Sequence, residues 1–433
     1  MNKSSSQISA IFPSLKGLGR KMSCATIGSV LEAVVFPLII FPFLARVLSN
    51  HDFGQVLVLW SLVAFITTVI GGNLPLVIYR RHKDFDANQR RVFFGRMFWF
   101  GTFVSVGITA AFLLLYNYIS DYININIPFH VAAPFLLFMG LQCINGILGA
   151  FLGSDLQFRR LLVAQLCSFV GSVGLISSYY LWGDGLWSIG LIISPLAYFS
   201  VLLTYLIRNH KIDLHQFPKL PFIHNIFKEV LVWIIAATIL NFVIFGDRWI
   251  MAWLGIDFSQ IAAYSIAVQA NMILIFVANK ISVSLIPLIS NMASLEQLTC
   301  KMMKKILIGI VSIVAIVLVG GSIAGPLYIK AFYGQGYWNE ASNLFYIMLG
   351  GIALYPLQII ARGFLIRFHP PTRTLLINLC GFGVILGGLI IFGSSMDVVD
   401  FSVLRTCAIM VTSIGAFSVV FAPFFQKLGN IQK

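Results

Sequence analysis

The chain has 433 residues, of which 59% are apolar and 10% are charged, and its net charge is +14. A soluble domain carries about 25% charged residues, so this composition excludes an ordinary soluble protein. The basic residues lie on short connectors that offer no folded basic surface for nucleic acid. We therefore predict an all-α polytopic membrane protein, because helices satisfy their own backbone hydrogen bonds in lipid.

Apolar runs follow one another along the whole chain, and about 20 apolar residues suffice to span the hydrocarbon core as a helix. The first run is too long for a signal-peptide h-region and has no small-residue cleavage site, so it is counted as a span. The twelve predicted transmembrane helices cover 24–46, 53–79, 94–116, 129–153, 161–182, 185–207, 229–254, 261–290, 306–329, 341–366, 374–393 and 400–424.

Lysine and arginine gather on alternate connectors, among them 80–96 and 208–228, whereas the opposite connectors keep only Arg46 and Lys330. Basic connectors remain on the cytoplasmic side. Both termini are therefore predicted to be cytoplasmic, and most of the net charge reflects this asymmetry.

The sequence DFGQV at 52–56 returns as DFSQI at 257–261, in each case after an apolar run. The two copies are six spans apart, so they lie on the same side, and the halves are predicted to be parallel repeats about an axis along the membrane normal. The predicted organisation is a six-helix lobe at 1–207, a cytoplasmic linker at 208–228 and a second six-helix lobe at 229–433. Two similar lobes around a central cavity are typical of a transporter.

Ionisable residues inside spans normally face a cavity or an opposite charge and mark function. Here cations outnumber acids, so the interior is predicted to be net positive and to form a cationic substrate-binding cavity. The cations within the spans are Arg248, Lys280, Arg362 and Arg405, and the acids are Glu32 and Asp247.

Lys280 lies near mid-span on one helical stripe with Gln269 and is the leading candidate for the cavity. The alternative is a structural pair with Glu32 or Asp247. Arg248 is a second candidate. Its neighbour Asp247 projects about 100° away around the helix, so the two are predicted to serve different partners.

The remaining charged candidates have interfacial alternatives. Arg362 lies near the cytoplasmic end of its span and Arg405 near the outer end, where either side chain could snorkel to the interface instead of binding substrate. Arg46 is either an interfacial anchor or an anion contact. Glu32 is either a counter-ion to a cavity cation or a site of ion coupling.

The first span contains Pro37 and Pro42, and proline removes a backbone hydrogen bond and kinks a helix. This pair is predicted to form a bendable gate, with a static kink as the alternative. The six cysteines show no metal-ligand spacing. No catalytic residue, metal or cofactor is predicted.

Four stretches resemble motifs of one family. They are LARVLSNHDFG at 44–54, GDRWIMAWLG at 246–255, AAYSIAVQ at 262–269 and GPLYIKAFYGQGY at 325–337. Together they resemble the polysaccharide transporter branch of the multidrug/oligosaccharidyl-lipid/polysaccharide (MOP) exporters, typified by Wzx-type O-antigen flippases. Arg46, Asp247 and Arg248 match family motif positions, whereas Lys280 matches none.

The resemblance implies a flippase in the bacterial inner membrane. Its substrate would be an undecaprenyl-diphosphate-linked oligosaccharide, such as an O-antigen unit of lipopolysaccharide, moved to the outer leaflet by alternating access. A proton or sodium gradient would drive it. A glycan polymerase and chain-length proteins would be its partners besides membrane lipids.

Two rivals remain open. A drug exporter of the same superfamily should line its cavity with acids that hold cations, and Glu32 is its main support here. A membrane glycan polymerase or ligase would need a sizeable outer loop, and the longest outer connector, NYISDYININIP, has twelve residues. A receptor or scaffold would not explain cations in the middle of the membrane.

Overall fold

The computed structural model describes residues 27, 35–155, 157–183, 186–283 and 300–431. Within these residues, 11 helices are long and apolar enough to cross a membrane. A shorter apolar helical stretch, Phe36–Val47, is the described part of the first predicted span. The chain is thus a multi-pass α-helical membrane protein.

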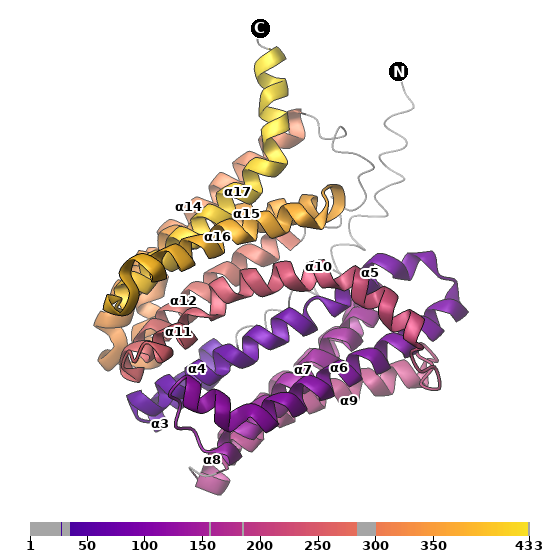
Figure 1. Cartoon of the computed structure of the whole chain (residues 1–433), viewed down its shortest axis with the longest axis horizontal. Helices are drawn as coiled ribbons and strands as arrows, with labels where there is room; N and C mark the ends of the chain where they lie inside the picture. Colours follow the sequence, from indigo (N-terminus) through magenta and orange to yellow (C-terminus); the bar gives the residue numbers. More distant parts are fainter. Residues whose placement is uncertain (1–26, 28–34, 156, 184–185, 284–299, 432–433) are drawn as a thin grey trace.

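The N-terminal half forms one bundle, drawn in indigo to purple-pink in Figure 1. Its elements are η1 (Phe36–Ile40), α3 (Phe41–Val47), α4 (Asn50–Ile66), η2 (Thr67–Gly71), α5 (Leu74–Arg81), α6 (Ala87–Tyr122), α7 (Phe129–Ser154), α8 (Phe158–Trp182), η5 (Trp187–Ile192) and α9 (Ile193–Arg208).

The C-terminal half forms the second bundle, in red to yellow. Its elements are α10 (Leu220–Phe245), α11 (Asp247–Trp253), α12 (Phe258–Val283), α14 (Cys300–Tyr333), α15 (Gln335–Phe368), α16 (Pro371–Phe392) and α17 (Val398–Ile431).

The two lobes meet along α4 and α12, which pack against each other across the boundary. The largest cluster of buried hydrophobic residues crosses this boundary and joins Phe53 and Val56 of α4 to Ile261 and Tyr264 of α12. In Figure 1 the lobes converge at the end that holds α3 and α11, and α15–α17 diverge from α5–α7 toward the other end. With the predicted orientation, the end where the lobes converge faces outward.

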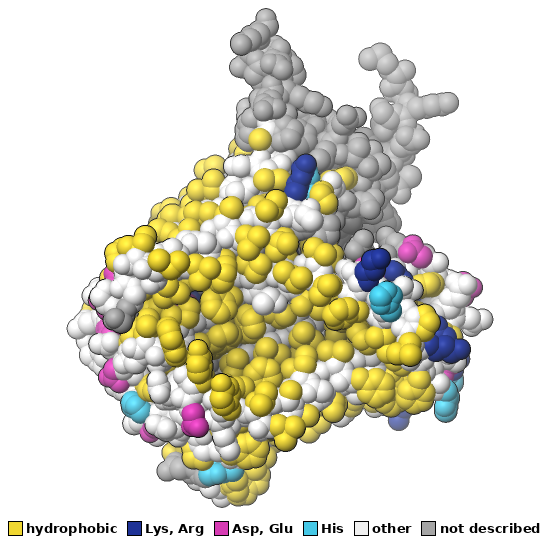
Figure 2. All heavy atoms as spheres, in the orientation of Figure 1, with side chains coloured by type: hydrophobic (Ala, Val, Ile, Leu, Met, Phe, Trp, Pro, Cys, Tyr) yellow, Lys and Arg dark blue, Asp and Glu magenta, His cyan; other side chains and the backbone are white. Residues whose placement is uncertain are grey.

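The outer surface of the bundle is apolar, as contact with lipid requires. Side chains such as Leu114 and Ile390 are 85% and 83% exposed. Figure 2 shows hydrophobic side chains across most of one face, with charged side chains toward its edges. This distribution is typical of a membrane protein. In lipid, apolar side chains are found on the surface as well as in the interior, because the lipid tails are themselves apolar.

Several elements differ from the predicted boundaries. The seventh predicted span is broken at Gly246 into α10 and α11, and α6 begins before its apolar stretch, where Asp86 and Gln89 form a capping box. The predicted linker 208–228 is partly helical, because α10 begins at Leu220.

The non-helical part of that linker is fixed to the N-terminal lobe. Trp99 Nε1 donates to the carbonyl of Leu214 at 2.8 Å, and Lys211 Nζ lies 2.9 Å from Asp155 Oδ2. A Cβ atom on Gly95 would lie 2.0 Å from the carbonyl oxygen of Asp213. The connection between the lobes is therefore a docked segment rather than a free tether.

The predicted orientation can be tested at two exposed residues, Asn88 at the start of α6 and Asn339 at the start of α15. A cysteine at Asn339 should react with an impermeant thiol reagent added to intact cells. A cysteine at Asn88 should react only after the cells are permeabilised, because it lies on a basic connector. Labelling of Asn88→Cys in intact cells would show that the predicted orientation is wrong.

Candidate functional site

The two repeated turns lie against each other where the lobes meet. Gly54, in the first copy, packs on the backbone of Phe258 in the second, and a Cβ atom on Gly54 would lie 1.9 Å from the carbonyl oxygen of Phe258. His51 and Phe258 also stack edge to face, with ring centroids 5.1 Å apart. Both turns are therefore at the same end of the molecule, and glycine at 54 is what allows their approach.

The proline pair of the first span forms part of the same closure. Phe41 N–H donates to the carbonyl of Phe36 with π-helical spacing, and Pro42 has no N–H. The carbonyl of Pro37 therefore loses both backbone donors that an α- or π-helix would supply. Tyr328 and Tyr333 of α14 donate their hydroxyls to it instead, at 2.5 and 3.3 Å.

Two further polar contacts join the lobes at this end. Arg46 Nη2 donates to the carbonyl of Phe332 at 3.4 Å, and Tyr337 donates its hydroxyl to Asn50 Oδ1 at 2.7 Å. The closure thus combines an apolar core with hydrogen bonds that join α14 and α15 to the first span and to the start of α4.

The second span is broken at the level of the cavity. η2 ends at Gly71, which packs so closely on α7 that a Cβ atom on Gly146 would lie 2.5 Å from its carbonyl oxygen. Asn73 Nδ2 then donates to the carbonyl of Val69 at 2.7 Å, which satisfies an acceptor freed by the break. The break directs Thr68, Gly72 and Asn73 of the N-terminal lobe toward the C-terminal lobe.

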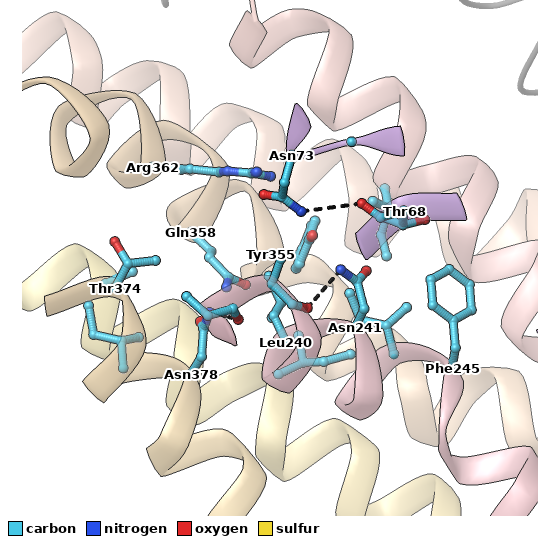
Figure 3. A pocket seen from close by; sticks show the side chains of 18 of the residues that line it. Thr68, Asn73, Leu240, Asn241, Phe245, Tyr355, Gln358, Arg362, Thr374 and Asn378 are labelled. Atoms are coloured by element: carbon cyan, nitrogen blue, oxygen red, sulfur yellow. Dashed lines mark hydrogen bonds between the residues drawn. The ribbon is translucent and has the colours of Figure 1, made fainter. Parts of the chain in front are cut away.

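A cavity of about 370 Å³ lies between this break and α10, α12, α15, α16 and α17. Its volume is within the usual range for small-ligand sites. Figure 3 shows the labelled side chains around it, with Arg362 extending toward Asn73. The polar and charged residues of its lining are Thr68, Asn73, Asn241, Tyr355, Gln358, Arg362, Thr374, Asn378 and Arg405.

Arg405 reaches the cavity from a buried ionic cluster. It is 1% exposed, and its Nη1 donates both to the carboxylate of Asp247 and to the carbonyl of Ile244, the latter at 2.7 Å. Tyr264 donates its hydroxyl to the same carboxylate oxygen of Asp247 at 2.5 Å. Asp247 is therefore the counter-ion of Arg405, and snorkelling, the interfacial alternative for Arg405, is wrong.

Arg248 belongs to the same cluster but turns to another partner. Its Nε donates to Ser265 Oγ at 2.9 Å, and its Nη1 lies 3.8 Å from Asp247 Oδ1. The shortest side-chain bonds of Asp247 and Arg248 go to different residues, but the two also form the longer ion pair with each other, so their separation is only partial. Adjacent residues of α12, Tyr264 and Ser265, thus hold adjacent residues of α11.

The cluster contains two arginines for one aspartate, so it leaves a net positive charge. The residues Arg405 and Gln358 line the cavity, and their atoms Arg405 Nε and Gln358 Oε1 are buried and have no hydrogen-bond partner among the described residues. Arg362 adds a second, exposed guanidinium from α15. The lining contains no carboxylate within the described residues, so the cavity presents cations, amides and hydroxyls.

The structure thus places the predicted site residues in three groups. Arg362 and Arg405 line the cavity, whereas Arg248 and Asp247 form the cluster behind it. Arg46, Pro37 and Pro42 lie at the closure where the lobes converge. Glu32 lies outside the described residues, and Lys280 falls in the last part of α12, whose side chains are outside the described set.

None of the uncharged polar residues of the cavity was among the predicted site residues. Asn378 is 2% exposed and donates to the carbonyl of Ala236 at 2.8 Å, and Gln358 is 8% exposed. Each is an amide inside an otherwise apolar span. That pattern was a usable signal, because a polar side chain within a span normally faces other protein groups or a cavity.

The helical bundles, the closure at one end and the cavity between the lobes form a fold that is also found in solved transporters. The structure resembles an inward-facing multidrug-resistance MATE transporter of the MOP superfamily, with a TM-score of 0.67, 12% identity and coverage of 92% of this chain and 94% of that one. It also resembles the lipid II flippase MurJ in an inward closed conformation, with a TM-score of 0.66, 12% identity and coverage of 93% and 87%.

A third similar structure is the eukaryotic MATE transporter AtDTX14, with a TM-score of 0.68, 13% identity and coverage of 93% and 95%. A sequence profile described as polysaccharide biosynthesis protein matches residues 43–343. The chain belongs to this family. No curated protein sequence matches it.

Proposed function

We propose that the protein is a flippase for an undecaprenyl-diphosphate-linked oligosaccharide, an O-antigen unit or a similar repeat, in the bacterial inner membrane. The observation that carries the proposal is the cavity between the lobes, whose charged lining residues are the arginines 362 and 405. Guanidinium groups bind phosphate oxygens through charge-assisted hydrogen bonds. The family description and the resemblance to MurJ support the same substrate class.

The lining has groups for each part of the substrate head. Arg362 is exposed and presents its donors to the diphosphate. Arg405 is neutralised in part by Asp247 and adds a second, buried guanidinium to the lining. The amides of Asn73, Asn241 and Gln358 suit sugar hydroxyls, which both donate and accept. The lipid tail stays in the bilayer.

The outer closure suits alternating access. Each of its hydrogen bonds between the lobes is made by a single side chain, so they can break as a set when the lobes tilt. Pro37 and Pro42 would act as the bending point, because the carbonyl of Pro37 is bonded to the opposite lobe rather than to its own helix. Coupling to protons or sodium, with Glu32 as a candidate, and assembly with a glycan polymerase and chain-length proteins remain part of this proposal.

The structure disfavours the two rivals. A cation exporter needs carboxylates in its cavity, and Asp247, the acid nearest to the described lining, is already bonded to Arg405 and Tyr264. A polymerase or ligase needs an outer catalytic region. The longest predicted outer connector, NYISDYININIP, is partly helical, because α6 continues to Tyr122. It therefore leaves even less room for a catalytic region.

Arg362 provides the direct test of the binding site. Arg362→Ala should lower surface glycan in a flippase-null strain, since loss of a charged hydrogen bond costs about 1.5–3 kcal/mol, roughly tenfold to over a hundredfold in binding. Arg362→Glu should do more harm, because it adds repulsion. Arg362→Lys should keep part of the activity.

The matched control is Arg373→Ala, which removes an exposed arginine outside the cavity on the same cytoplasmic side. Membrane abundance is measured for every variant by immunoblotting. Wild-type glycan from Arg362→Glu at normal abundance would refute the cationic binding site.

A further inference from the structure

A second concave site lies on the membrane-facing side of the N-terminal lobe. A groove of about 550 Å³ runs between the start of α8 and the end of α9. These helices pack mainly on each other and on α7. The groove is therefore separate from the cavity between the lobes.

The charges of this groove are unbalanced. It is lined by Arg160 and Arg208 and by no acidic residue. The nearby Asp155 is bonded to Arg90 and Lys211, and neither arginine of the groove forms an ion pair with a described residue. Arg160 instead lies over the ring of Tyr205, 5.1 Å from its centroid, which fixes the guanidinium at the groove.

A stripe of hydroxyls continues from the arginines into the membrane. Ser200, Thr204 and Arg208 are spaced i, i+4, i+8 on α9, all three are exposed, and all three line the groove. By helical rise, Thr204 and Ser200 lie about 6 and 12 Å deeper than Arg208. Two polar side chains are thus exposed on a span where lipid alone would favour apolar ones.

The flanking surface is apolar. Val163 and Leu166 of α8 are each 43% exposed, as is Leu196 of α9. The site therefore offers two cations at the membrane interface, hydroxyls one and two turns below, and apolar walls beyond. This order matches a phospholipid read from phosphate through glycerol ester to acyl chain.

We propose that this groove binds the headgroup of an anionic phospholipid of the cytoplasmic leaflet, such as phosphatidylglycerol or cardiolipin. Basic pockets between transmembrane helices on the cytoplasmic side bind such headgroups. The two guanidinium groups contact the phosphate, and Thr204 and Ser200 donate to the ester oxygens. The bound lipid supplies the negative charge that the groove lacks.

The test is retention of lipid by the full-length protein in nanodiscs of phosphatidylcholine mixed with phosphatidylglycerol, read by native mass spectrometry. Each arginine near an anionic headgroup is expected to contribute about fivefold in affinity. Arg160→Ala/Arg208→Ala should therefore weaken phosphatidylglycerol binding about 25-fold. The control Arg159→Ala/Lys219→Ala removes two exposed charges from the same side but outside the groove, and should change it little.

A second variant separates a shaped site from general attraction to a charged surface. Thr204→Phe fills the groove without changing charge and should also expel the lipid. The proposed site would be refuted if Thr204→Phe retained as much lipid as the wild type. It would also be refuted if the two double variants lost equal amounts of lipid. Thermal stabilisation by inorganic phosphate alone, or preferential retention of an undecaprenyl diphosphate over phosphatidylglycerol, would refute it as well.

Discussion

Asp247→Ala is expected to destabilise the protein more than any other single charge substitution. Asp247 and Arg405 are each 1% exposed and Arg248 is 3% exposed, and Asp247 is the carboxylate that forms an ion pair with both arginines. Removing one partner of a buried ion pair typically costs 3–5 kcal/mol, because the remaining charge is left uncompensated. Here two guanidinium groups would remain. The expected result is a large drop in membrane abundance and in the thermal unfolding temperature in detergent.

The control is Asp121→Ala, which removes an exposed carboxylate at the end of α6. A second variant, Asp247→Ala/Arg405→Leu, removes the charge that Asp247 balances and should recover part of the lost stability. If Asp247→Ala unfolded at the same temperature as Asp121→Ala, the buried ion pairs of Asp247 would not stabilise the protein.

The cluster connects stability to the proposed transport. Two arginines bound to one aspartate hold a positive charge inside the membrane, and Arg405 carries it to the wall of the cavity. An anionic substrate would complete the compensation that Asp247 begins. The family resemblance at 246–255 and at 262–269 gains a physical basis, because those two stretches supply Asp247, Arg248, Tyr264 and Ser265.

Much of the fold could be predicted from apolar runs, because spanning helices are selected by length and hydropathy. The predicted spans at 129–153 and 161–182 correspond to α7 and α8 within a few residues. The ends of α6 and α15 could not be predicted in the same way. Both helices continue into polar sequence outside the hydrocarbon, where capping and tertiary contacts, rather than hydropathy, decide where a helix ends.

The breaks inside spans were harder to predict. The sequence signals near 71–75 are two glycines, an asparagine and a proline, yet kinks at such residues are common in membrane helices and do not reveal a cavity by themselves. The break places Asn73 at the cavity only because Gly71 packs on α7. That contact depends on Gly146, which is far away in sequence.

For the site, too, the sequence predicted the general charge but not the contacts between distant residues. The sequence predicted a net positive interior, and the cationic cavity of the described residues agrees with that prediction. The pairing of Asp247 with Arg405 joins residues 158 positions apart, so no local pattern could reveal it. Helical geometry did predict that Asp247 and Arg248 diverge, because this follows from the rotation per residue alone.

The repeated turns show what the sequence could predict and what it could not. The similarity of 52–56 and 257–261 predicted that the two turns lie on the same side, but it did not predict that they touch. Their one small-residue difference, Gly54 against Ser259, is explained by the contact. Gly54 faces the backbone of Phe258 with no room for a Cβ atom, whereas Ser259 instead donates its hydroxyl to Asp257, which lowers the pKa of that carboxyl.

Gly54→Ala is therefore expected to prevent closure of the outer end. The added Cβ atom would lie 1.9 Å from the carbonyl oxygen of Phe258, and backbone on both sides cannot yield as a flexible side chain would. The lobes would have to separate by more than an ångström, which would stretch the bonds from Tyr328 and Tyr337 to the N-terminal lobe. Surface glycan should fall to the level of the flippase-null strain, and a cysteine at Thr68 in the cavity should react faster with an impermeant thiol reagent added outside.

The matched control is Gly107→Ala in α6, where nothing lies within 4 Å of the added atom. It should leave transport unchanged and slightly favour the helix, since alanine exceeds glycine by about 1 kcal/mol in helix propensity. Gly54→Ser is the sharper variant, because it gives the first turn the residue that the second already carries. Sequence similarity between the repeats would predict that serine is accepted, whereas the contact with Phe258 predicts that it fails as alanine does. Normal glycan display and unchanged labelling of Thr68→Cys in Gly54→Ser would show that the outer closure does not depend on this contact.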